Sequence, residues 1–262
     1  MNYQIKSRIL SNKRLGRECY LMEFEAAPIA RAAKPGQFIH LRCSDGVDPL
    51  LRRPFSIHKV NRRTIYILYR LAGRGTELLA GKKAGEYLDI VGPLGNGFSY
   101  SRSKSANSVL VAGGMGVAPL LMLARELIQH QTKGNMLVLI GARTKKLILC
   151  EKDFKALGIK VKISIEGGSS RQGVVTDLLG GVLSAGRYPL PTVIYACGPK
   201  KMLKKVAEIS RKYDITAQAS LESNMACGVG ACLGCAINTK TGYQRVCTEG
   251  PVFNLDEIIW EE

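Results

Sequence analysis

The first hundred residues alternate short hydrophobic runs, rich in β-branched and aromatic side chains, with segments of turn-forming residues. The runs cover residues 19–24, 37–43, 55–60, 64–71 and 87–91. Strands of this length and spacing predict an antiparallel β-barrel. One short helix is expected to interrupt it after the stretch 73–76, where Thr76 can cap the apolar pair Leu78-Leu79. The glycine- and proline-rich stretch 92–97 then ends this half of the chain.

From about residue 108 the pattern changes to continuous apolar strands separated by helical periodicity. A buried strand at 109–112 is followed by a glycine turn, a helix over 117–131 and a strand at 137–140, which together predict a βαβ unit. Further strands are expected at 161–165 and 193–197, and further helices at 151–157, 174–183 and 202–213. This order is typical of a nucleotide-binding α/β domain with an open parallel sheet.

The most specific motif is a group of four cysteines near the C-terminus with the spacing C-x4-C-x2-C-x11-C: Cys227, Cys232, Cys235 and Cys247. This is the ligand spacing of a plant-type [2Fe–2S] cluster. Glycines among these cysteines leave room for backbone N–H groups to face the sulfurs. A structural zinc site is the alternative, but zinc usually takes two C-x2-C-like pairs, and only one is present here.

The residues after 219 are too few to bury a core of their own, so we expect the cluster to organise them. The predicted fold is therefore β plus α/β in three parts. An antiparallel β-barrel domain covers residues 1–99, a parallel-sheet nucleotide-binding domain covers 100–219, and a small cluster-binding module covers 220–262.

Composition and charge narrow the classes of function. The chain has 262 residues, of which 46% are hydrophobic, and a formal net charge of +17. Its basic residues form scattered doublets without a contiguous basic arm, so nucleic-acid binding is not expected. No signal peptide or membrane-spanning stretch is recognisable, so no membrane association is expected. The other four cysteines are scattered as free thiols are in a reducing compartment, which favours the cytoplasm: Cys19, Cys43, Cys150 and Cys197.

Two turns in the second half are candidate nucleotide contacts. The first follows the strand at 109–112 with the pattern G-x-G-x-x-P, where free backbone N–H groups and the helix dipole favour a pyrophosphate. The second follows the strand at 193–197 at the same predicted edge of the sheet, where ligands of parallel sheets bind. The candidate NAD-binding residues are Gly113, Gly114, Gly116, Pro119, Cys197, Gly198 and Pro199.

The barrel half contains two further anion-friendly sites. Arg53-Pro54-Phe55-Ser56 offers a guanidinium, an aromatic ring and a hydroxyl that can meet a flavin. Arg70 and the helix start at Gly75 and Thr76 offer a second phosphate contact. Together these residues predict a dinucleotide lying across the barrel.

The three histidines show no metal-binding spacing, so structural or surface roles are expected: His40, His58 and His130. The chain also has no serine nucleophile motif and no paired carboxylates with a spacing suited to acid–base work. No catalytic residue is therefore assigned.

These motifs resemble those of the ferredoxin–NADP reductase-like superfamily, in which a flavin-binding barrel precedes a pyridine-nucleotide domain. The resemblance rests on Arg53-Pro54-Phe55-Ser56, Gly73-x-Gly75-Thr76, Gly114-x-Gly116-x-x-Pro119 and Cys197-Gly198-Pro199-x-x-Met202. The tail resembles that of the electron-transfer subunits of bacterial class 1B, NAD-dependent dihydroorotate dehydrogenases. Its matching stretches are 220–222, 225–235 and 245–253.

The resemblance implies FAD, a [2Fe–2S] cluster and NAD as cofactors. Carried over residue by residue, it implies FAD contacts at Arg53, Pro54, Phe55, Ser56, Leu68, Tyr69, Arg70, Gly75 and Thr76, with the four C-terminal cysteines as cluster ligands. Phe55 stands where the wider superfamily often has tyrosine, so the ring is kept and the hydroxyl lost. Whether Arg143 to Lys146 attract the 2′-phosphate of NADP stays open, and only the resemblance favours NAD.

The function implied by the resemblance is electron transfer in pyrimidine (UMP) biosynthesis. An FMN-containing catalytic subunit would oxidise dihydroorotate, and electrons would pass through the cluster and FAD to NAD+, in a dimer of heterodimers. This chain has no room for an FMN barrel of about 250 residues beside its own domains. One alternative is the flavin and iron–sulfur subunit of an NAD(P)H:ferredoxin or sulfide oxidoreductase. The other is a non-enzymatic zinc–thiolate interaction module.

Overall fold

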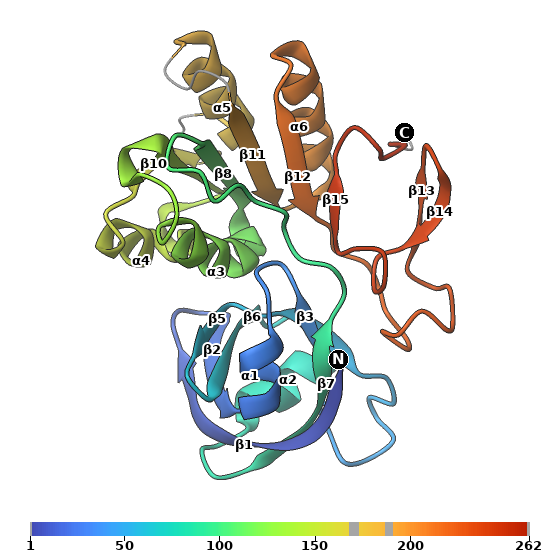
Figure 1. Ribbon diagram of the computed structural model, residues 1–262. Coiled ribbons are helices and arrows are strands. Elements are labelled where there is room, and N and C mark those ends of the chain that lie inside the picture. The colour runs from blue at the N-terminus through green and yellow to red at the C-terminus, as the bar shows by residue number, and fades with distance from the viewer. Residues whose placement is uncertain (1, 168–172, 187–190, 261–262) are drawn as a thin grey trace.

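The protein is seen in a computed structural model that describes residues 2–167, 173–186 and 191–260. Within these residues the chain forms a seven-stranded antiparallel sheet, a six-stranded sheet and a two-stranded hairpin. Figure 1 shows the first sheet curled into a barrel below the second sheet, with the C-terminal segment beside them both. Residues 221–260 are called the C-terminal segment below.

The N-terminal sheet has the strand order β4-β3-β7-β1-β2-β6-β5. Its strands are β1 (Tyr3–Arg14), β2 (Cys19–Glu25), β3 (Phe38–Leu41), β4 (Arg53–Ser56), β5 (Lys59–Asn61), β6 (Thr64–Arg70) and β7 (Tyr87–Leu94). Two short helices, α1 (Ala27–Ala32) and α2 (Arg74–Gly81), accompany it. Alternate residues point inward and form one apolar core, which includes Ile9, Phe24, Ile39 and Ile67. The predicted antiparallel barrel is confirmed.

Three details of the barrel differ from the sequence prediction. The long strand β1 was not expected, because most of its side chains are polar and few of them are buried. The run 55–60 is divided between β4 and β5. Thr76 does not cap α2, since the helix begins after Gly73. The Thr76 hydroxyl instead accepts a bond from the N–H of Ala72 and donates one to the Gly73 carbonyl, both at 2.8 Å.

The second sheet has the strand order β10-β9-β8-β11-β12-β15, in which only β15 is antiparallel to its neighbour. Its parallel strands are β8 (Asn107–Gly113), β9 (Met136–Ala142), β10 (Lys160–Ile165), β11 (Thr192–Cys197) and β12 (Thr216–Ser220). The α-helices that connect them are α3 (Val117–Leu127), α4 (Glu151–Ala156), α5 (Val175–Ser184) and α6 (Lys200–Lys212), and the 3-10 turns are Gly114–Gly116, Lys133–Asn135 and Lys145–Leu147. The predicted parallel sheet is confirmed, although β12 was missed.

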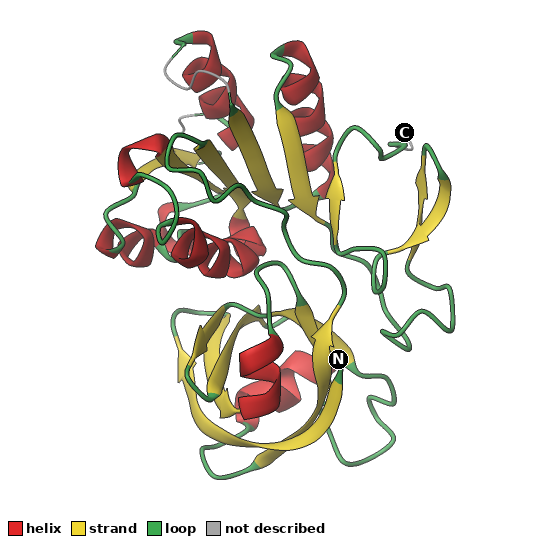
Figure 2. Ribbon diagram, viewed as in Figure 1, coloured by secondary structure: helices red, strands yellow, loops and turns green. Residues whose placement is uncertain are grey.

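Helices cover both faces of this sheet (Figure 2). Val109 and Val111 of β8 face the core that contains α5 and α6, whereas Leu110 and Ala112 face the core that contains α3. Because both faces are buried, the strands are continuously apolar, which explains why the sequence pattern identified them.

The C-terminal segment contains the hairpin of β13 (Ala236–Thr239) and β14 (Gly242–Arg245), and the strand β15 (Val252–Asn254). Strand β15 pairs antiparallel with β12, so the segment extends the second sheet. Val246, Cys247 and Phe253 pack into the same core as α6. The C-terminal segment therefore shares the hydrophobic core of the α/β domain. Within the described residues, no helix is long and apolar enough to cross a bilayer.

Candidate functional site

A cleft of about 680 Å³ lies where the barrel meets the second sheet. Residues of β3, β4 and β6 form one wall, and the turn after β8 and the carboxyl ends of β11 and β12 form the other. Ligands of parallel sheets bind beyond the carboxyl ends of the strands, so the cleft is where the topology favours a ligand.

The barrel wall contains nearly all the residues predicted to contact FAD. Those that line the cleft are Arg53, Pro54, Phe55, Ser56, Leu68, Tyr69, Arg70 and Thr76. The ring of Phe55 meets that of Tyr69 edge to face, with 5.9 Å between centroids. Gly75 is not in the lining, but a Cβ there would lie 3.5 Å from Arg53 Nε. Strand β4 and the start of α2 therefore lie close together, as expected if both contact one dinucleotide.

The opposite wall brings together the two glycine turns. A Cβ at Gly116 would lie 1.9 Å from the Cys197 carbonyl oxygen, and one at Gly113 would lie 2.8 Å from Pro199 Cδ. Only glycine allows the two turns to approach so closely. Pro119 and Cys197 line the cleft, whereas Gly113, Gly114, Gly116, Gly198 and Pro199 lie beside it without lining it.

Sequence reasoning missed a stretch of the cleft wall that begins at the last residue of β12 and covers residues 220–225. The carboxyl end of the fifth parallel strand, β12, could have located this stretch, but the sequence pattern did not identify that strand. Part of the Glu222 side chain reaches the solvent of the cleft, but protein atoms lie around its carboxyl. The resulting desolvation raises the pKa of the carboxyl, and the positive charge of Arg70 opposes this shift. This stretch leads directly into the cysteine motif two residues after Met225.

The four motif cysteines form two pairs. The Cys232 thiol acts on that of Cys227, and the Cys235 thiol acts on that of Cys247. The backbone N–H groups of Val229 and Cys232 point at Cys227 Sγ, at 3.5 and 3.4 Å. Burial raises the pKa of the Cys227 thiol, but these N–H groups, the Cys232 thiol and the Ala231 N–H together outweigh burial and bring the pKa to about 6. The Cys227 sulfur is therefore prepared to carry negative charge.

This donor set, four cysteine thiols with the spacing of a plant-type cluster, suits a [2Fe–2S] cluster. A [2Fe–2S] cluster needs two thiolates on each of two irons, and the thiols are arranged as two pairs. Burial and the neighbouring Cys235 thiol raise the pKa of Cys247 to about 11, so this thiol would have to lose its proton as metal binds.

An ion pair fastens the two cysteine-bearing stretches to each other. Arg245 donates from Nε and Nη2 to the Glu249 carboxylate, at 3.0 and 2.5 Å, and its Nη1 donates to the Gly230 carbonyl at 3.0 Å. The guanidinium thus joins the loop that carries Cys227 to the turn that carries Cys247.

The histidines were expected to be structural or on the surface. His58 is buried, and its Nδ1 lies 2.8 Å from the Ala118 carbonyl oxygen, so it joins the barrel to α3. His130 lies 3.4 Å from the Glu126 carboxylate on the same helical turn. His40 is also buried, and it packs on the cysteine loop at Gly228.

Comparisons with known proteins agree with this geometry. Residues 222–259 match the iron-sulfur cluster binding domain of dihydroorotate dehydrogenase B, and residues 110–208 match the oxidoreductase NAD-binding domain. A solved chain from the NADH-dependent reduced ferredoxin-NADP oxidoreductase superposes with a TM-score of 0.85 at 25% identity, covering 97% of this chain and 90% of that one. A ferredoxin NADP+ reductase from Neisseria gonorrhoeae with bound FAD and NADP shares the fold, with a TM-score of 0.67 at 16% identity over 83% of this chain and 99% of that one.

Two curated relatives cover both chains almost completely. Both are named dihydroorotate dehydrogenase B (NAD(+)), electron transfer subunit. The relative from Desulforamulus reducens is 38% identical over 100% of each chain. The relative from Caldanaerobacter subterraneus subsp. tengcongensis is 38% identical over 99% of this chain and 100% of its own. This chain belongs to the family of the electron transfer subunits of dihydroorotate dehydrogenase B.

Proposed function

We propose that this chain carries electrons between a dihydroorotate-oxidising, FMN-containing partner subunit and NAD+, in pyrimidine biosynthesis. One observation carries the proposal: residues 220–225 line the cleft and then run directly into the cysteine loop. A flavin site and a cluster site that share a segment are suited to exchange electrons with each other. When bound, FAD supplies hydride exchange with nicotinamide and single-electron exchange with an iron–sulfur cluster.

In this proposal the barrel wall holds FAD. The Arg53 guanidinium and the N–H groups at the start of α2, around Gly75 and Thr76, are the groups suited to its phosphates. Ser56 offers a hydroxyl to the ring system, and Leu68, Tyr69 and Arg70 of β6 continue the wall. Pro54, Phe55 and Leu68 offer apolar contacts to the isoalloxazine.

NAD(H) would lie against the opposite wall. The turn at Gly113, Gly114 and Gly116 leads into helix α3, whose N-terminus favours a phosphate, and the second turn lies against it. We propose NAD rather than NADP because both relatives carry NAD(+) in their names.

The four thiols would hold the [2Fe–2S] cluster. The alternative hypothesis, a zinc–thiolate module, has less support. Zinc requires one tetrahedral set of thiolates, whereas these thiols lie in two pairs beside a flavin-type cleft. The NAD(P)H:ferredoxin alternative is weaker as well, because all four ligand positions are cysteines and the curated relatives carry the other name.

The partner would dock on the outer side of the cysteine loop. Cys232 is exposed there, and the neighbouring Val229 and Leu233 are 52% and 63% exposed. Exposed apolar side chains beside a redox centre provide a contact surface with a short path for electrons. We further propose a dimer of two heterodimers, and a cytoplasmic location, which suits eight cysteines that form no disulfide.

The cofactor assignment is tested by purifying the chain under reducing, anaerobic conditions. We expect about one FAD, two irons and two sulfides per chain, and reduction of an artificial electron acceptor by NADH. A colourless protein that contains zinc would contradict the proposal.

The docking surface is tested with Leu233→Asp, which places a charge in the proposed interface. We expect this variant to keep its flavin and iron but to bind the partner subunit at least tenfold more weakly in a co-purification or titration experiment. Leu15→Asp, in the β1–β2 turn and 50% exposed, is the matched control and should bind as the wild type does. Unchanged binding by Leu233→Asp would place the interface elsewhere.

A further inference from the structure

His40 is a buried polar side chain for which the described residues provide no ordinary hydrogen-bond partner. It lies in β3, where its Cα pairs with Pro54 of β4 on one side and with Val91 of β7 on the other. The side chain is 0% exposed, and among the described residues neither ring nitrogen has a partner with ordinary hydrogen-bond geometry. Buried polar groups of a native fold are nearly always satisfied, so an unpaired imidazole in a core calls for a reason.

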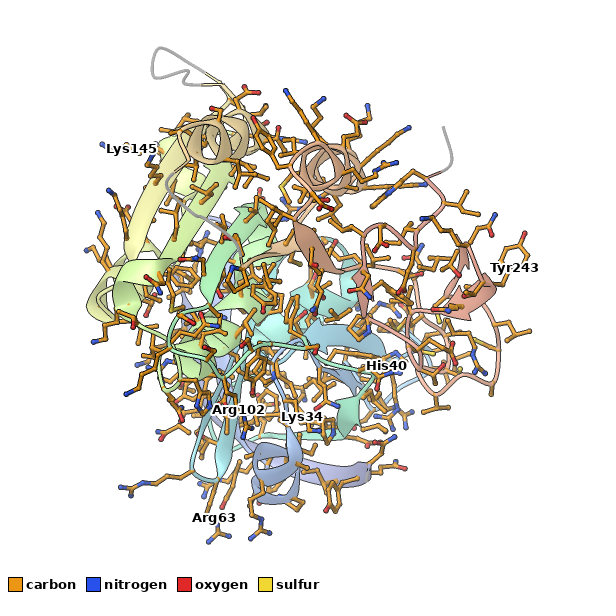
Figure 3. The ribbon with its side chains drawn as sticks, turned by 45° about the horizontal axis from the view of Figure 1, so that its top comes forward. Lys34, His40, Arg63, Arg102, Lys145 and Tyr243 are labelled. Carbon is orange, nitrogen blue, oxygen red and sulfur yellow. The ribbon has the colours of Figure 1, made fainter. Side chains whose placement is uncertain are left out.

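The ring faces the cysteine loop. A Cβ at Gly228 would lie 2.5 Å from His40 Nδ1 and 3.0 Å from Cγ, so the loop backbone rests directly on the imidazole. Gly228 also has a φ of +71°, which disfavours a side chain for a second reason. Backbone groups of Cys227 and Arg52 lie close enough to interact with the ring. Figure 3 shows His40 on the side of the barrel that faces the C-terminal segment.

The C-terminal segment is held to the barrel on two sides. On the Cys247 side, Asn96 donates from Nδ2 to the carbonyl oxygens of Thr248 and Glu249, at 3.0 and 3.1 Å. On the Cys227 side, the contact with His40 is the corresponding support. His40 sits on the strand next to β4, whose residues Arg53 to Ser56 line the cleft.

We propose that His40 is a positioning residue for the iron–sulfur cluster: it supports the Cys227 loop against the flavin-binding strand and holds a ring N–H, at Nδ1, beside Gly228, the residue that follows the cluster ligand Cys227. The proposal rests on the proposed function, because it requires a cluster on the four thiols. An N–H donor near the cluster stabilises the added negative charge of its reduced form, and hydrogen bonds of this kind help to set cluster potentials. His40 thus helps to set the cluster potential as well as its place.

The test is a redox titration of three His40 variants, followed by the EPR signal of the reduced cluster. His40→Asn places an amide nitrogen near the position of Nδ1, and His40→Gln places one near the position of Nε2. His40→Leu removes the hydrogen-bonding group. For His40→Leu we expect the reduced-to-oxidised ratio at a fixed potential to fall about tenfold, which for one electron is a downward shift of about 59 mV. His40→Asn should stay within about threefold of the wild type. The iron content and the visible circular dichroism of each variant are recorded alongside.

His58→Leu is the matched control, because it removes another buried histidine of the barrel, one that contacts α3. It should lower thermal stability without moving the cluster potential. A wild-type potential in His40→Leu with full iron content would overturn the inference and leave the proposed function intact. If His40→Leu does not fold, His40→Gln must show the shift that His40→Asn lacks, and equal potentials in these two would overturn it. A wild-type protein without iron and sulfide would instead refute the proposed function.

Discussion

The ion pair between Arg245 and Glu249 gives the most quantitative prediction, for the variant Glu249→Gln. The Glu249 carboxylate accepts bonds from the Arg245 backbone N–H at 2.6 Å and from two guanidinium nitrogens. The same guanidinium holds the Gly230 carbonyl. Glu249→Gln keeps the shape of the side chain and removes its negative charge. It therefore weakens the ion pair with Arg245 without leaving a cavity.

The magnitude follows from the pKa of Glu249. The hydrogen bond from Arg245 lowers this pKa from 4.5 to about 2, which without solvent would correspond to about 3 kcal/mol. The two side chains are 37% and 34% exposed, so water screens the pair and about 1 kcal/mol remains. A change of about 1 kcal/mol in the opening equilibrium of the segment is a factor of about five.

The assay follows the loss of cluster absorbance in the presence of excess iron chelator, under conditions in which the segment closes faster than the chelator captures iron. The rate then reports the opening equilibrium, and we expect Glu249→Gln to lose iron about fivefold faster than the wild type. Lys205→Gln is the control, since it removes an ion pair of similar length, 2.8 Å, on helix α6. Equal rates for Glu249→Gln and the wild type would refute the reasoning.

The pH dependence of this effect has a definite sign. Because the pKa of Glu249 is lower in the folded protein, its contribution is fully present above about pH 4.5 and is lost as the pH falls toward about 2. The fivefold ratio of rates should therefore stay constant between pH 6 and 8. A ratio that changes across this range would assign the effect to another titrating group.

The remaining predictions concern the two walls of the cleft. Gly116→Ala would place a Cβ 1.9 Å from the Cys197 carbonyl oxygen, so we expect NADH to bind at least tenfold more weakly in a fluorescence titration. Gly134→Ala, whose Cβ would have no described atom within 4 Å, should bind NADH normally. Arg53→Ala should weaken FAD binding about 10- to 100-fold by loss of a charged contact, measured by flavin release on dilution. Arg63→Ala, whose side chain is 77% exposed, should retain FAD.

The sequence predicted best where the signal is local. The cysteine motif and the G-x-G-x-x-P turn each lie within one stretch of chain. In the structure the motif cysteines interact in two pairs, and Gly116 of the turn lies against Cys197. The parallel strands were identified because both faces of the sheet are buried and their sequences are continuously apolar.

The misses have physical reasons that a single sequence hides. Strand β1 carries polar side chains on most of its length, so its pattern resembles a loop. Strand β12 reads Thr-Ala-Gln-Ala-Ser and is buried by its neighbours rather than by its own hydrophobicity. Without β12, the cleft wall at 220–225 could not be placed. The contact between His40 and Gly228 joins distant parts of the chain, and no spacing rule reveals it.

The central claim is that this chain relays electrons and needs a partner to oxidise dihydroorotate. The most direct measurement is NADH formation from dihydroorotate and NAD+ by this chain alone, by the FMN-containing subunit alone and by the two together. We expect NADH only from the mixture, with the chain alone still reducing an artificial acceptor from NADH. Dihydroorotate oxidation by this chain alone, or no NADH from a mixture in which both subunits hold their cofactors, would contradict the account.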